Sequence, residues 1–158
     1  MLVGILDELD AWAVAENVEA QAEGLPLLRP SKLRLLGQLA LLEAQAPLTL
    51  AATKDVDLKA DCEHAVWREL ERLLARRGFT LDPLGHEIWM PPETRYEPLF
   101  TGQLVSLTMA DVDAVLMSKA RMAPDKNRPL VVEYLARGGS ERFFELAARH
   151  QVDLEAFL

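Results

Sequence analysis

Two acidic residues separated by one apolar residue, Asp55–Val56–Asp57, constrain the fold of this chain more than any other stretch. With Leu58 they alternate acidic and apolar, which predicts a β-strand, because successive side chains of a strand point to opposite faces. Both carboxylates then share one face, with Cα atoms about 6.6 Å apart. Like charges at that spacing repel unless a cation lies between them. The strand is therefore either an edge strand with two surface acids or a Mg²⁺ site for phosphoryl or nucleotidyl transfer.

The composition fits a single folded domain of 158 residues. Hydrophobic residues make up 50% of the chain and charged residues 27%, which allows a sizeable core and argues against disorder. The formal net charge of −8 argues against non-specific DNA binding, which requires a basic surface, but leaves room for a local basic patch. We therefore expect one domain over residues 1–158 that does not bind DNA non-specifically.

Signals for export or membrane insertion are not expected in this chain. Its apolar start is followed at once by Asp7, Glu8 and Asp10, whereas a signal peptide begins with positive charge and has a longer apolar run. No stretch approaches the ~20 apolar residues of a membrane-spanning helix. The single cysteine, Cys62, cannot form an internal disulfide, which favours a reducing compartment. We expect a cytoplasmic protein with no membrane partner.

Periodicity and turn residues divide the chain into a mixed region and a helical region. We expect strands at residues 33–36, 55–58, 79–81, 86–90 and 103–109. We expect helices at residues 1–12, 13–23, 38–45, 62–77, 110–122, 127–137 and 140–150, with a terminal turn at 152–157. For the 62–77 helix, Asp61 is the expected N-cap and Gly78 the expected residue after the C-cap. The pattern predicts an α/β (α+β) fold with a core over residues 30–109 and a C-terminal helical extension over 110–158.

The order of these signals carries a resemblance to a known superfamily. A strand ends in a glycine that opens a helix, and the next strand carries the two aspartates, in the segments Leu35-Leu36-Gly37-Gln38-Leu39-Ala40 and Thr53-Lys54-Asp55-Val56-Asp57-Leu58. This order resembles the nucleotidyltransferase superfamily of the DNA polymerase β type. The second segment is similar to the signature of its small prokaryotic members, the AbiEii-like and minimal (MNT-type) nucleotidyltransferases associated with toxin–antitoxin and phage-defence systems.

A later region extends the resemblance to roughly residues 30–137. Its segments are Trp89-Met90-Pro91-Pro92, Pro98-Leu99-Phe100, Val105-Ser106-Leu107 and the run from Asp111 to Arg121. They are similar to the end of these small domains, where a strand leads into a helix bearing a lysine and a further helix follows. The resemblance implies a mixed sheet flanked by helices, with the helical extension after it.

The resemblance also implies site residues. Asp55 and Asp57 would hold Mg²⁺, and Glu87 is the candidate third acid that helps to activate the acceptor. The candidates for binding the triphosphate of an NTP substrate are Gly37, Gln38, Thr53, Lys54 and Lys119. The implied reaction moves an NMP from the NTP to a hydroxyl on RNA or protein, by positioning and charge neutralisation rather than covalent catalysis.

Departures from the family pattern keep a second interpretation open. Gln38 stands where the family carries a small residue, and by alternation Glu87 shares a face with Trp89, so the third acid falls on either position. The family carries a basic–acidic pair of residues after the helix that bears the lysine, and residues 125–128 match this pair only roughly. The alternative is a catalytically inactive binding module of the same fold, such as an antitoxin or a regulatory partner of a toxin. Base preference, acceptor, partner and oligomeric state are left open.

A basic stripe on the expected 62–77 helix has two interpretations. Arg68, Arg72 and Arg76 recur every four residues, and Glu69 and Glu71 lie between them. This spacing suits ordinary pairing on a solvated helix face. It also suits contact with RNA or an acidic partner.

Overall fold

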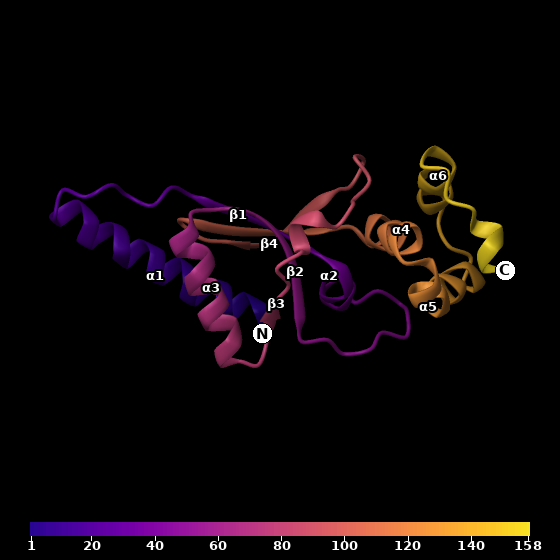
Figure 1. Ribbon diagram of the computed structural model, residues 1–158, viewed down its shortest axis with the longest axis horizontal. Helices are drawn as coiled ribbons and strands as arrows, with labels where there is room; N and C mark the ends of the chain where they lie inside the picture. The colour runs from indigo at the N-terminus through magenta and orange to yellow at the C-terminus, as the bar shows by residue number, and fades with distance from the viewer.

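A five-stranded mixed sheet organises the chain in the computed structural model, which describes residues 1–158 (Figure 1). The strand order is β3-β2-β1-β5-β4. Strand β1 pairs antiparallel with β2 and parallel with β5, β3 is parallel to β2, and β4 is antiparallel to β5. The bounds are β1 Ser31–Leu36, β2 Asp55–Asp61, β3 Thr80–Leu81, β4 Tyr96–Thr101 and β5 Val105–Ala110. The predicted α/β fold class is confirmed.

The helices gather in two groups around this sheet. Helices α1 and α3 contact each other on one face of the sheet, whereas α4, α5 and α6 lie together beyond its far end, with α4 packed on α2 (Figure 1). The bounds are α1 Leu2–Ala22, α2 Gly37–Glu43, α3 His64–Arg76, α4 Val112–Met122, α5 Pro124–Ala136, α6 Glu141–Arg149, and the 3₁₀ helices η1 Gly85–Glu87 and η2 Leu154–Phe157. None of these helices is long and apolar enough to cross a membrane.

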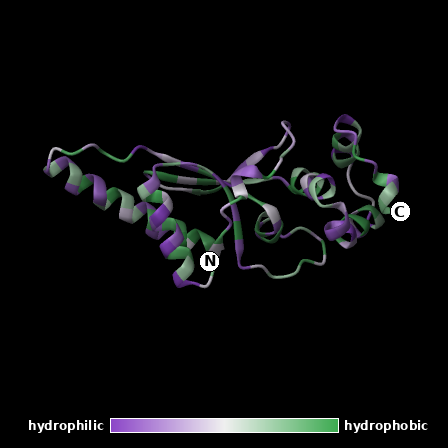
Figure 2. Ribbon diagram, in the orientation of Figure 1, coloured by the Kyte–Doolittle hydropathy of each residue, from purple (hydrophilic) through white to green (hydrophobic).

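The core lies between the sheet and the first helix group and continues into the C-terminal helices. One cluster of 32 buried residues runs from α1 to η2. Along β1 the alternation is clear, because Leu33 and Leu35 are buried while Lys32 and Arg34 are exposed. Figure 2 shows this interleaving of hydrophilic and hydrophobic residues along the strands and along α3. The opposite face of β1 is therefore polar, as period-2 burial against one layer of helices requires.

Several predicted elements differ from those observed. The two N-terminal segments form one helix, α1, and the predicted strand at 86–90 is wrong, because residues 85–87 form η1. Strand β4 was not expected; it is an edge strand whose pairing shifts register between Pro98 and Phe100, so its alternation is broken. Asp61 ends β2 instead of capping α3, and the N-cap is Glu63. Gly78 does follow the C-cap with a positive φ of 78°, as predicted.

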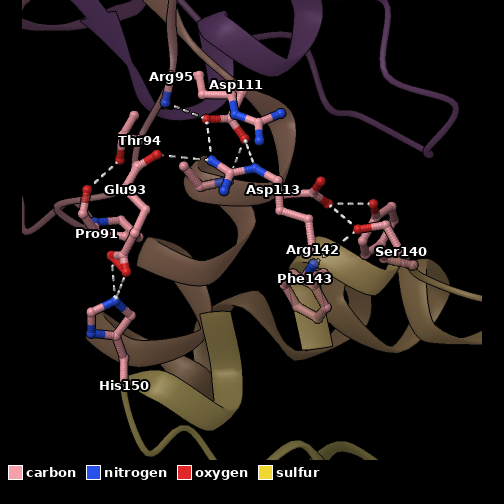
Figure 3. Close-up of polar contacts among 12 residues, drawn as sticks. Pro91, Glu93, Thr94, Arg95, Asp111, Asp113, Ser140, Arg142, Phe143 and His150 are labelled. Carbon is pink, nitrogen blue, oxygen red and sulfur yellow. Dashed lines mark hydrogen bonds and ion pairs between the residues drawn. The ribbon is translucent and has the colours of Figure 1, made fainter. Parts of the chain in front are cut away.

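A polar network attaches the C-terminal helices to the segment that precedes β4 (Figure 3). Asp111 caps α4 by accepting from Ala114 N, and it also accepts from Arg95 N at 2.8 Å and from the Arg142 guanidinium at 2.9 Å. Glu93 accepts from His150 Nε2 at 2.7 Å, and this hydrogen bond lowers the pKa of Glu93. Residues from β5–α4, α6 and the 89–95 segment are thus joined, which orients the extension relative to the sheet.

Candidate functional site

The end of β1 and the middle of β2 meet at a contact that only glycine permits. Gly37 follows β1 with a φ of +67°, and Leu36 lies opposite Asp57 in the β1–β2 register. A Cβ added to Gly37 would lie 2.2 Å from Asp57 Oδ2. The absence of a side chain therefore lets the Asp57 carboxylate approach the backbone where α2 begins.

The Asp57 carboxyl is half-buried among charged neighbours from three elements. Its pKa is raised to about 6. The largest cause is burial, followed by a hydrogen bond with the Asp82 side chain and by the charge of Asp82. The charge of Asp55 adds to this rise, whereas the ammonium of Lys119 on α4 lowers the pKa. Two neighbouring carboxyl groups share a proton or a cation more readily than they carry two negative charges.

Lys119 connects this carboxyl pair to a neighbouring pocket. Burial lowers the pKa of Lys119, and the nearby Asp57 carboxylate opposes that effect. The same lysine lines a pocket of about 390 Å³, together with Gln38, Thr53, Lys126 and Asn127. The pocket lining contains two lysines and no acidic residue, so its electrostatics suit an anion.

The donor set suits a hard cation that is completed by phosphate oxygens. Asp57 and Asp82 could supply oxygen ligands near Lys119, and Mg²⁺ in proteins is commonly held by one or two carboxylates plus substrate phosphates. No group of three or more His, Cys, Asp or Glu residues is arranged as a metal cage of its own. The residues present therefore fit a metal that arrives with a phosphate ligand better than a stand-alone metal centre.

Three of the five candidate triphosphate residues line the pocket, and two, Gly37 and Lys54, do not. Gln38 and Thr53 lie in its wall with Lys119, and Gln38 Nε2 donates to Ala51 O at 3.1 Å. Thr53 Oγ1 accepts from Asp55 N at 3.1 Å, which fixes the start of β2. Lys54 is exposed and lies over the Phe79 ring, 4.7 Å from its centroid, instead of in the pocket.

Asp82, which the sequence did not single out, contacts Asp57, whereas the predicted third acid Glu87 lies elsewhere. Glu87 is exposed on η1, 3.8 Å from His86, and takes no part in the Asp57 cluster. Asp82 immediately follows β3, which runs parallel to β2, and its backbone N donates to Val56 O at 2.9 Å. Asp82–Pro83 is typical of a turn, and the alternation from Phe79 to Asp82 is the signal that could have indicated an acid there.

We expect Gly37→Ala to destabilise the protein more than the same substitution at Gly24, a glycine of similar backbone conformation away from the site. Alanine at a positive φ costs about 1–2 kcal/mol in backbone strain, and its Cβ would also displace the Asp57 carboxylate. Gly24 has a similar φ of +68° but no atom within 4 Å of an added Cβ, so Gly24→Ala carries the strain alone. Urea unfolding should show the larger loss for Gly37→Ala, and equal losses would contradict a tight Gly37–Asp57 contact.

Comparison with known proteins gives no relative for this chain: no family model matches it, nor does any curated protein or solved structure. Its functional interpretation rests on the arrangement of Gly37, Asp57, Asp82 and Lys119.

Proposed function

We propose that this protein binds a nucleoside triphosphate with Mg²⁺ and transfers an NMP from it to a hydroxyl acceptor. The observation that carries the proposal is the Asp57–Asp82 carboxyl pair, with Lys119 between it and a pocket that has cationic and no acidic lining residues. A carboxyl pair beside a cationic pocket matches the two needs of nucleotidyl transfer, namely a metal on the phosphate that reacts and positive charge for the other phosphates.

The residues of the site divide this work by their charge and position. Lys119 and Lys126 would bind phosphate oxygens in the pocket, and Gln38 and Asn127 offer amide donors beside them. Asp57 and Asp82 would hold Mg²⁺, which supplies charge neutralisation at the phosphate that is attacked. Asp55 starts the same strand face and adds negative charge that favours the cation. Gly37 keeps the approach to Asp57 free of a side chain.

The proposal is tested by thermal unfolding with and without MgCl₂ and each NTP. A ligand at a hundredfold excess over its Kd stabilises the native state by about 2.7 kcal/mol. We expect this shift in the parent protein and its loss in the Asp55→Asn/Asp57→Asn variant. Glu87→Gln is the matched control, because Glu87 is an exposed acid outside the cluster, and it should keep the shift. A parent protein that does not respond, or a double variant that responds equally, would refute nucleotide binding at this site.

Gln38 favours a second candidate function, a module that binds a nucleotide or a protein partner without turnover. Its side chain lies along the pocket wall, hydrogen-bonded to Ala51 O. The superfamily that this chain resembles has a small residue at this position. Incubation with α-labelled NTP and total cellular RNA separates the two functions. Labelled RNA supports the transferase, whereas a nucleotide-dependent thermal shift without any labelled product supports the binding module.

A further inference from the structure

The face of the sheet opposite α1 and α3 carries a compact group of cations. Lys32 and Arg34 are exposed on β1, and Lys59 projects from the same face of β2. In the β1–β2 register, Arg34 lies directly opposite Lys59, and Lys32 lies opposite Asp61. These three cations, here called the basic sheet face, line a hollow of about 310 Å³ with Ala60 and Asp61.

The basic sheet face is not neutralised by the protein itself. None of its three cations has a carboxylate within 4.0 Å, and Asp61, the acid that lies among them, pairs with Arg29 at 2.8 Å. Like charges directly opposite each other on neighbouring strands destabilise a sheet. The opposed cations Arg34 and Lys59, in a chain with a net charge of −8, indicate a surface that binds an external anion.

Two neighbouring side chains narrow the kind of anion. The Arg34 guanidinium lies 4.5 Å from the centroid of the half-exposed Tyr96 ring, so an aromatic face accompanies the charge. Thr108 lies beside Arg34 in the β1–β5 register, so its hydroxyl belongs to the same face. Cations with an aromatic ring are the elements that bind phosphates and stack bases of a single strand, and a neighbouring hydroxyl suits the 2′-hydroxyl of RNA.

The basic sheet face also leads to the candidate site. Asp57 precedes Lys59 by two residues on β2, so both side chains lie on one face with Cα atoms about 6.6 Å apart. On β1, Leu36 continues the same face beyond Arg34 and is buried opposite Asp57. The cations of the basic sheet face therefore end where the Asp57 cluster begins.

We propose that the basic sheet face binds single-stranded RNA and presents its terminal hydroxyl to the Asp57 site as the acceptor. The second half of this statement rests on the proposed function. The first half, RNA binding through Arg34, Lys59, Lys32 and Tyr96, does not require nucleotide or metal.

The test is fluorescence anisotropy with a labelled ten-nucleotide RNA of mixed sequence at low salt, without Mg²⁺ and NTP. We expect Arg34→Gln/Lys59→Gln to weaken RNA binding at least tenfold and to flatten the salt dependence by roughly 0.7 in log–log slope per lost phosphate contact. The matched control is Arg68→Gln/Arg76→Gln, which removes the same charge from exposed positions on α3 and should change binding less than threefold. Tyr96→Leu should weaken binding about tenfold through lost stacking.

Each other outcome overturns the assignment in a defined way. An equal loss in the α3 control shows that RNA binding does not belong to the basic sheet face, and equal affinity for DNA of the same sequence removes the assignment to RNA. A parent protein that binds neither overturns the proposal altogether. Lys32→Gln, a single exposed substitution, keeps the test valid if the double variant does not fold. The Asp55→Asn/Asp57→Asn variant should retain RNA binding, so a failed nucleotide test leaves this proposal standing.

Discussion

Asp57→Asn is expected to stabilise the metal-free protein at pH 8 and to have little effect on stability at pH 4. Asp57 has its pKa raised from 3.8 to about 6 by folding, so the native state binds this proton more tightly than the unfolded chain does. The stabilisation by the bound proton is complete below the unfolded value and is lost as the pH rises through about 6. Asparagine resembles the protonated acid and avoids that loss.

The size of the effect follows from the shift and from solvent screening. For a fully buried group, a rise in pKa from 3.8 to about 6 corresponds to about 3 kcal/mol in the free energy of unfolding. Because Asp57 is only half-buried, screening reduces the expected gain of Asp57→Asn at pH 8 to about 1 kcal/mol. Urea unfolding at several pH values measures it, with Asp61→Asn as an exposed control on the same strand. If Asp57→Asn is less stable than the parent at pH 8, the ionised Asp57 carboxylate stabilises the fold and the prediction is wrong.

Asp10→Ala is expected to destabilise the protein by about 2–4 kcal/mol, the largest loss of stability anticipated for a single substitution here. The Asp10 side chain is only 9% exposed, although it belongs to α1. Its carboxylate accepts from the backbone N–H groups of Gln103, Leu104 and Val105 at 3.1, 2.7 and 2.9 Å. Removing it leaves three amides at the β4–β5 turn without their acceptor.

Matched variants isolate the contribution of the Asp10 carboxylate. Asp10→Asn keeps one acceptor oxygen and should lose about half as much stability as Asp10→Ala. Asp7→Ala changes an exposed acid of the same helix and should stay within about 0.5 kcal/mol of the parent. Chemical denaturation measures all three. If Asp10→Ala and Asp7→Ala unfold at the same denaturant concentration, the amides of the turn have found other acceptors and the Asp10 contact does not stabilise the fold.

Local patterns predicted the parts of this fold that depend on neighbours in the sequence. The alternation around Asp55 and Asp57 predicted β2 and the burial of Val56 and Leu58, because the period of a strand is a property of its backbone. The stripe of Val66, Leu70, Leu73 and Leu74 predicted α3 in the same way. Gly37 was placed correctly at the junction of β1 and α2.

The predictions failed where distant segments decide a conformation. The 86–90 segment alternates like a strand, but its first two residues belong to η1 and the rest form no strand. Gly85, at the start of η1, packs against the backbone of Leu58, where an added Cβ would lie 2.8 Å from Leu58 O. Strand β4 has no fully buried residue and carries Pro98, so its pairing with β5 rather than its own pattern makes it a strand. Glu87 was chosen by position in the sequence, whereas Asp82 reaches Asp57 through the parallel pairing of β2 with β3.

The sequence by itself determined the fold class, the strand that carries Asp55 and Asp57, and the glycine that begins α2, because each depends on backbone periods and on the freedom of a residue without a side chain. Only the tertiary structure decided which charges meet. Asp82 and Lys119 reach Asp57 through strand pairing and through the packing of α4 on α2, and Asp10 reaches the β4–β5 turn across more than 90 residues. Burial and charge act over distances in space, so no local pattern specifies them.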